Sequence, residues 1–231
     1  MKNYIVIGSS SGIGKSITDI LVKEGHTVFG SYRNNVCQSS QENLHYFPLD
    51  VLEQTIDANN FPETIDGFVY CPGSINLKPF KRFKEQDFLE DYRLQVTGAI
   101  NNLQAILPKL NLSQDASVVF FSSIAVKHGF GFHAQVSASK GAIEGLTKAL
   151  SAEFAPKIRV NAIAPSLTDT PLAGRMLNTN EKKEAHAKNN PLGRVGEAED
   201  IASLAAFLLS PKSSWMTGQI IHLDGGYSTI K

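Results

Sequence analysis

The stretch "YIVIGSSSGIGKSITDIL", residues 4–21, decides the fold. It opens with a run of apolar residues short enough for a buried strand, and from residue 13 onward its apolar residues recur at helical spacing. The helical pattern stops at Gly25, a residue that commonly follows a helix C-terminus. A strand, a tight turn and a helix in this order predict the first unit of a parallel α/β sheet.

The glycine-rich turn "GSSSGIG", residues 8–14, joins this strand to the helix. Gly8 suits the tight turn, Gly12 lets backbone approach a pyrophosphate, and Gly14 allows close packing of the helix. The start of the helix adds free N–H groups and the positive end of its dipole. The turn therefore predicts a dinucleotide site, held by Gly8, Ser10, Ser11, Gly12, Ile13 and Gly14.

The rest of the chain continues the alternation. Further strands are predicted over 26–32, 44–50, 65–71, 117–123, 158–164 and 218–224, with helices over 86–110, 134–154 and 199–210. This pattern predicts a Rossmann-type doubly wound parallel sheet of three α/β/α layers, with one domain over 1–231. Only 170–190 lies outside the pattern. It is a surface helix and loop, or a substrate lid.

Composition limits the function classes. Twenty-two basic and twenty-two acidic residues give no net charge, so neither nucleic acid nor a membrane surface is an expected partner. A small-molecule substrate fits this charge balance better.

Cys37 and Cys71 form no CxxC pair, and no metal-ligand pattern occurs. We therefore expect no metal site and no disulfide framework. With a first apolar run too short for a signal peptide, we expect a cytoplasmic protein.

Several separated stretches resemble one family. They are "GSSSGIG" (8–14), "VVFFSSIA" (118–125), "SASKGAIEGLTKALSAEFA" (137–155), "IRVNAIAPSLTDTPL" (158–172), "PLGRVGEAEDIASLAAFLLS" (191–210) and "MTGQIIHLDGG" (216–226). In this order they resemble the short-chain dehydrogenases/reductases over nearly the whole chain. The resemblance implies a nicotinamide-dependent oxidoreductase acting on an alcohol or ketone, and a homo-oligomer, either dimer or tetramer.

The same resemblance indicates which residues hold the cofactor. Members that prefer NAD carry an acid at the end of the second strand, where this chain has Tyr32 followed by Arg33. NADP(H) is therefore favoured over NAD(H), although Arg33 on a turn is also a common solvated residue. Asp50 resembles the acid that contacts adenine, and is otherwise a turn residue. Pro165 and Thr170 resemble the residues beside the nicotinamide carboxamide.

The catalytic positions match the family in part. By resemblance, Ser123 polarises the carbonyl, and Lys140 assists a tyrosine four residues earlier and holds the nicotinamide ribose. That earlier position is Val136, and the position of the family's water-anchoring asparagine is Gln95. The i and i+4 spacing places positions 136 and 140 on one helix face. Because valine cannot donate a proton, the family's usual proton route cannot operate here.

Other groups can replace the tyrosine, and His133 is the best substitute. His133 lies three residues before Val136 and titrates near neutral pH, unless it is only a polar residue at a helix start. The Lys140 ammonium can polarise an oxygen, and a water held by Ser123 or Gln95 can deliver a proton. Tyr70 is expected near the crevice as a packing residue with its hydroxyl at the rim.

Two functions remain open from the sequence. One is an NADP(H)-linked oxidoreductase with an altered proton route. The other is a cofactor-binding homologue without turnover, acting as a scaffold, partner subunit or nucleotide sensor. Retention of both Ser123 and Lys140 favours the first, because both groups serve the reaction; the missing acid at Val136 favours the second.

Overall fold

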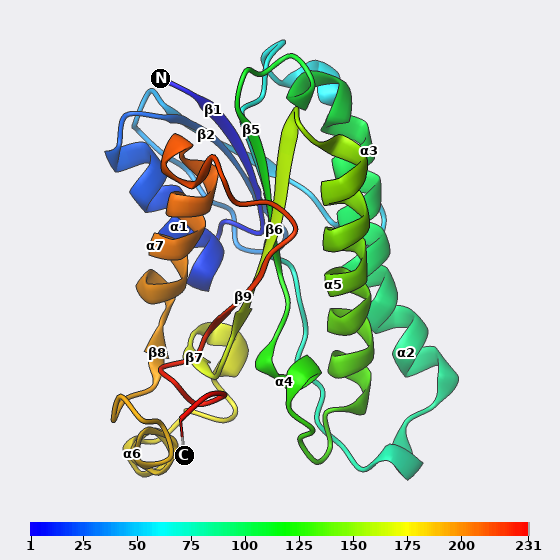
Figure 1. Cartoon of the computed structure of the whole chain (residues 1–231), viewed down its shortest axis with the longest axis vertical. Helices are drawn as coiled ribbons and strands as arrows, with labels where there is room; N and C mark the ends of the chain where they lie inside the picture. Colours follow the sequence, from blue (N-terminus) through cyan, green and yellow to red (C-terminus); the bar gives the residue numbers. More distant parts are fainter. Residues whose placement is uncertain (231) are drawn as a thin grey trace.

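A computed structural model describes residues 1–230, which form a seven-stranded parallel sheet with helices on both faces (Figure 1). Its strands, in spatial order, are β3 (Leu44–Pro48), β2 (Thr27–Tyr32), β1 (Asn3–Ile7), β4 (Gly67–Tyr70), β5 (Ala116–Phe121), β6 (Ile158–Pro165) and β9 (Ile220–Leu223). The order reverses between β1 and β4, and such a switch point leaves a crevice at the carboxyl ends of the strands. The three-layer Rossmann-type fold expected from the sequence is confirmed.

Two helical layers cover the sheet. One is α1 (Gly12–Lys23) with α7 (Ala198–Leu209), and the other is α2 (Glu85–Tyr92), α3 (Gly98–Leu110) and α5 (Ala134–Phe154). Alternate strand residues supply the two cores: Val6 packs toward α1 and α7, whereas Ile5 and Ile7 pack toward α3 and α5. Strands buried on both faces explain why "YIVI" is apolar throughout rather than alternating.

The helix predicted over 86–110 is not regular. A π-helical turn at Arg93–Thr97 separates α2 from α3. Within it, the Tyr70 hydroxyl donates to the Leu94 carbonyl oxygen at 2.6 Å, which gives that carbonyl a partner outside the helix. The expectation that Tyr70 has its hydroxyl at the crevice rim is wrong, because the residue is buried beneath this turn, against Gly98.

Smaller elements gather at the carboxyl end of the sheet. They are α4 (Ile124–Lys127), α6 (Asn180–Lys188), the two-stranded pair β7 (Thr168–Asp169) and β8 (Gly196–Glu197), and a 3-10 turn at Pro171–Ala173. Figure 1 shows α4 and α6 in the lower half of the view, whereas the N-terminus lies at the top. The sequence predicted neither α4 nor the short pair; the other strand and helix boundaries agree within two residues.

Candidate active site

A cavity of about 620 Å³ lies at the carboxyl ends of the strands. It brings together many of the residues that the sequence singled out: Ile13, Gln95, Ser123, His133, Val136, Lys140, Pro165 and Thr170. Part of its wall is apolar, formed by Ile75, Leu77, Phe130, Leu172 and Met176. A concave, mainly apolar space with a few convergent polar groups is typical of a small-molecule site.

The glycine-rich turn reaches this cavity through Ile13 and is held by β2. Ser9 N–H donates to the Ser31 carbonyl at 2.9 Å, and Gly8 N–H donates to Ser31 Oγ at 2.9 Å. A Cβ on Gly14 would lie 2.1 Å from the Gly8 carbonyl oxygen, so only glycine fits there. Gly12, with a φ of +53°, faces Thr170 closely: a Cβ on Gly12 would lie 3.3 Å from the Thr170 Cβ.

The start of α1 fits a phosphate group. Ser11 is the N-cap residue, but its side chain makes no capping hydrogen bond. The first N–H groups of the helix therefore remain available to an anion, on the side where the helix dipole is positive. The start of α1 therefore has the free N–H groups and the positive dipole end that an anion site requires.

Arg33 and Asp50 lie together beyond β2 and β3, outside the wall of the cavity. Arg33 Nε donates to Asp50 Oδ2 at 2.8 Å, and the Arg33 side chain remains 55% exposed. Asp50 also accepts from Leu52 N–H, as a turn residue does. The two residues predicted for the adenosine side are thus paired with one another, and Arg33 keeps its two terminal nitrogens for a further ligand.

Strand β5 positions the two polar residues at the centre of the cavity. Ser123 follows the strand as the N-cap of α4, where its Oγ accepts from Ala125 N–H at 3.2 Å and keeps its own hydrogen for another acceptor. Lys140 reaches across from α5, and its Nζ donates to the Phe121 carbonyl oxygen at 2.8 Å. Burial lowers the pKa of Lys140 to about 8, against the opposing influence of Asp91 and Cys71.

Val136 lies one helical turn before Lys140 on the cavity wall, and only 7% of it is exposed. His133, at the start of α5, holds its Nδ1 at 2.7 Å from the Gly131 carbonyl oxygen, and its ring centroid is 5.3 Å from that of Phe130. A carbonyl partner requires the hydrogen on Nδ1, so Nε2 of a neutral His133 is an acceptor. His133 can donate a proton to a ligand only from its imidazolium form.

The segment 170–190 contributes directly to the site. Leu172 and Met176 belong to its apolar wall, and His186 and Asn189 add polar atoms from α6 and its end. The same segment was expected to be either a surface helix with a loop or a lid. The structure has a helix here, α6, that contains no buried residue and borders the cavity through His186.

Three further residues belong to the site but were missed. Ser74 and Tyr227 line the cavity, and Asp91 lies behind its wall, where it accepts from the Gln95 side chain. The sequence gives no local signal for them, because they lie in three different segments and belong to no shared motif. Only the packing of α2 and the C-terminal turn against the sheet brings them to the same place.

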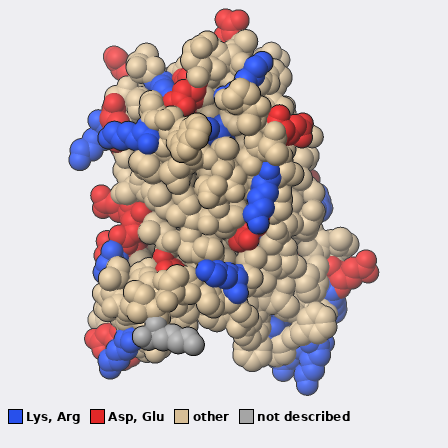
Figure 2. Space-filling model, in the orientation of Figure 1, with Lys and Arg blue, Asp and Glu red and all other residues tan. Residues whose placement is uncertain are grey.

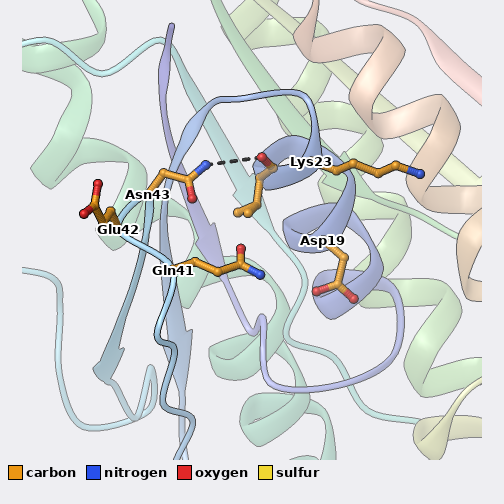
Figure 3. Close-up of a pocket in the computed structure, with 6 residues that line it drawn as sticks. Asp19, Lys23, Gln41, Glu42 and Asn43 are labelled. Carbon is orange, nitrogen blue, oxygen red and sulfur yellow. Dashed lines mark hydrogen bonds between the residues drawn. The ribbon is translucent and has the colours of Figure 1, made fainter.

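A second hollow, of about 710 Å³, lies between α1 and the segment before β3 (Figure 3). Figure 3 shows Asp19 and Lys23 on one side of it and Gln41, Glu42 and Asn43 on the other. Asn43 Nδ2 closes one end by donating to the Val22 carbonyl at 3.2 Å. This open groove contains no residue predicted for catalysis or cofactor binding.

The surface carries charges of both signs, interspersed over the face shown in Figure 2. Within residues 1–230, no helix is long and apolar enough to cross a bilayer. The same residues contain no cluster of His, Cys, Asp and Glu arranged for a metal ion, and both cysteines are free thiols.

Comparison with known proteins identifies the family. Residues 7–228 match a family model described as enoyl-(acyl carrier protein) reductase. A 3-oxoacyl-(acyl-carrier-protein) reductase of Thermotoga maritima is 30% identical over 97% of this chain and 97% of its own. A tropinone reductase homologue of Arabidopsis thaliana is 34% identical over 96% of this chain and 78% of its own.

Solved structures of other proteins have a similar fold. A short-chain dehydrogenase family protein of Francisella tularensis has a TM-score of 0.86 and 28% identity, with both chains fully covered. ElxO with bound NADP has a TM-score of 0.89 and 25% identity, over 99% of each chain. With the glycine turn, the parallel sheet and the cavity at its carboxyl edge, these likenesses show that the chain belongs to the short-chain dehydrogenase/reductase family of oxidoreductases.

Proposed function

We propose that this protein is an NADP(H)-linked oxidoreductase that transfers hydride between the nicotinamide and an alcohol or ketone, by an altered proton route. One observation carries the proposal: Ser123 and Lys140 meet Thr170 and the end of the glycine-rich turn around a single cavity. A hydroxyl that can donate and an ammonium at the same wall are groups that stabilise charge on a carbonyl oxygen. The apolar remainder of the wall suits an organic substrate.

The cofactor residues are proposed from their positions. The turn 8–14 and the start of α1 would hold the pyrophosphate, and Pro165, Thr170 and Lys140 would lie beside the nicotinamide riboside. The bound nicotinamide would supply the hydride. NADP(H) is preferred over NAD(H) because no acid follows β2 and because the terminal nitrogens of Arg33 are free to meet a 2′-phosphate. Binding of NADP by ElxO supports this choice.

The proton route must differ from that of relatives with a tyrosine at the position of Val136. The valine offers only hydrocarbon to the cavity, so a proton for the carbonyl oxygen must come from another group. Lys140 is the best placed, since its Nζ is a cavity-wall ammonium with hydrogens left beyond the bond to Phe121. His133, or a water held by Ser123 or Gln95, is the alternative.

A binding and turnover experiment tests this function. NADPH and NADH are titrated by fluorescence, and cofactor oxidation is then followed by absorbance over a panel of ketones, quinones and β-ketoacyl thioesters. We expect tighter binding of NADPH, and turnover of at least one carbonyl class. Arg33→Ala should weaken NADPH binding by about 10- to 100-fold and leave NADH binding unchanged, because one charged phosphate contact is worth about 1.5–3 kcal/mol. Equal loss for both cofactors would contradict the proposed role of Arg33.

A second function is favoured by one observation, the apolar side chain of Val136 at the cavity wall. A homologue that binds the cofactor without turnover, as a scaffold, partner subunit or nucleotide sensor, needs no acid there. NADPH binding without oxidation on any carbonyl of the panel would establish this second function in place of the first.

The remaining features are proposed with the function. Residues 1–231 would form one domain, with 170–190 as a lid over the cavity. The protein would be a cytoplasmic homo-oligomer, a dimer or tetramer, paired through the helices predicted over 86–110 and 134–154 and the C-terminal strand predicted over 218–224. Exposed small residues on α5 support close helix approach: Ala138, Gly145 and Ala149.

A further inference from the structure

A buried carboxylate lies directly behind the cavity wall. Asp91, near the end of α2, is 4% exposed and accepts hydrogen bonds from three neighbours. Gln95 Nε2 lies 2.8 Å from both carboxylate oxygens, Ser139 Oγ lies 2.6 Å from Oδ2, and Ser74 Oγ bonds to Oδ1. All three are uncharged groups, and within residues 1–230 Asp91 has no Lys, Arg or His nitrogen within ion-pair distance.

This carboxylate fixes the orientation of Gln95. A carboxylate can only accept, so the NH₂ group of Gln95 must face Asp91 and its Oε1 must face away. Gln95 is 1% exposed, and Oε1 has no hydrogen-bond partner among residues 1–230. A buried acceptor without a partner costs free energy, so a donor beside it is strongly favoured.

Lys140 is the donor that shares this corner of the site. A Cβ built on Gly73 would lie 3.4 Å from Gln95 Oε1 and 3.8 Å from Lys140 Nζ, so both atoms flank the same glycine. In the structure Nζ donates to the Phe121 carbonyl oxygen, which leaves two ammonium hydrogens for other acceptors. The Gln95 oxygen therefore faces the region of the ammonium, either directly or through one water.

Asp91 also supplies the negative charge in this region. Burial lowers the pKa of Lys140, and Asp91 is the main group that opposes it. Cys71 also faces Lys140, but burial raises the pKa of its thiol to about 12, so it stays uncharged near neutral pH. The other titratable groups that line the cavity with Lys140 are His133, His186, Arg194 and Tyr227. Glu144, one turn beyond Lys140 on α5, accepts from Ser122 Oγ at 2.6 Å.

We infer that Asp91 is a positioning residue for Lys140: through Gln95 it presents a fixed acceptor to the Lys140 ammonium, and its charge keeps that lysine protonated in a cavity without a tyrosine. The catalytic consequence of this inference, proton donation by Lys140, rests on the proposed function. During carbonyl reduction, an N–H bond of Lys140 breaks and an O–H bond forms on the carbonyl oxygen, whose carbon has accepted the hydride. Lys140 is left as a neutral amine and recovers its proton from solvent.

The test measures the pKa of Lys140 without requiring turnover. The full-length protein is labelled with acetic anhydride over a pH series, and acetylation of Lys140 is quantified by peptide mass spectrometry. We expect Asp91→Asn to lower the pKa of Lys140 by half a unit or more, a roughly threefold change in its proton equilibrium, because a nearby buried charge is removed. Asp19→Asn, which removes a surface carboxylate beside Lys15, is the matched control and should leave Lys140 unchanged. An unchanged pKa in Asp91→Asn would overturn the inference.

A pH-rate profile gives the second readout. If Lys140 donates the proton, the alkaline fall in reduction rate should move to lower pH in Asp91→Asn by the same amount as the labelling shift. A purely structural role would lower the rate equally at every pH. Should Asp91→Asn fail to fold, Gln95→Leu removes the acceptor and keeps the charge, and it should lower the pKa of Lys140 by a smaller amount; no shift there overturns the inference. If Asp91→Asn lowers the pKa of Lys140 but the parent protein reduces no carbonyl, the proposed function is refuted and the positioning role of Asp91 stands.

Discussion

Under the proposed function, Val136 presents hydrocarbon at the position of a proton donor. Ser123 and Lys140 remain at the cavity wall with it, so the surroundings that a phenol would need are largely present. Val136 itself lines this cavity of about 620 Å³. The effect of this position can therefore be isolated by one substitution and a matched control.

Val136→Tyr should raise the rate of carbonyl reduction by about 100-fold, since a positioned general acid contributes about 10²–10⁴. The hydroxyl would lie one helical turn from Lys140, whose ammonium favours the phenolate form. Val136→Phe adds the same ring without the hydroxyl and should give no gain. Steady-state kinetics at saturating NADPH measure both variants. Equal rates for the two would show that Gln95 or the pocket, rather than Val136, limits turnover.

Lys140 gives the protein a pH-dependent weakness. Its pKa is about 8 in the folded protein against an ordinary 10.5, so folding releases its proton between these values. Below about pH 8 the buried ammonium of Lys140 lowers the free energy of unfolding by its full amount. This loss disappears as the pH rises from about 8 toward 10.5. Lys140→Met should therefore increase the free energy of unfolding at pH 7 by about 1–3 kcal/mol.

Urea denaturation at pH 7 and pH 9.5 checks this expectation. The parent should gain stability relative to Lys140→Met between the two pH values, and the advantage of the variant should shrink. A constant difference between the two proteins would show that Lys140 is not desolvated.

The reduction rate of the parent should fall as the pH passes about 8, because the ammonium donor is lost. A profile that changes in His133→Ala would assign the proton to His133 instead.

The turn between β1 and α1 is the element with the least room for change. At Gly14, even a methyl group would clash with the Gly8 carbonyl oxygen. Gly14→Ala should cost about 1–3 kcal/mol of stability and weaken NADPH by at least about tenfold, because the turn must open to admit the methyl group. Thermal unfolding and a fluorescence titration of NADPH measure the two effects.

Gly145→Ala is the control for that substitution. Gly145 lies within α5, and a Cβ there would have no atom within 4 Å. Alanine should stabilise the helix by about 0.5–1 kcal/mol and leave NADPH binding unchanged. If both variants bound NADPH as the parent does, the turn would not be the pyrophosphate site.

The whole molecule has an unpartnered helix face that bears on its assembly. Small residues of α5 are exposed on that face, where they permit close approach by a second helix. Light scattering of the purified protein should give a dimer or tetramer, and Ala149→Arg should shift it toward monomer by adding a bulky charge at the contact. A monomer in the parent protein would contradict this expectation.

Most of the fold can be predicted from the sequence because the patterns that indicate its elements are local. The apolar run 4–7, the glycine spacing and the helical periodicity of 134–154 depend on neighbours a few residues away, and backbone geometry turns them into β1, the turn and α5. The π turn at Arg93–Thr97 could not be predicted in this way, because Tyr70 from a different strand bonds to it.

The sequence by itself determined the sheet, the glycine-rich turn, and the spacing that places Val136 and Lys140 on one helix face. Only the tertiary structure decided that Asp91 lies buried beside Gln95 and that Tyr227 reaches the cavity. It also set the pKa of Lys140, through burial and the charge of Asp91. Spacing along one helix follows from its repeat, whereas burial and electrostatic interactions arise between segments that meet only after folding.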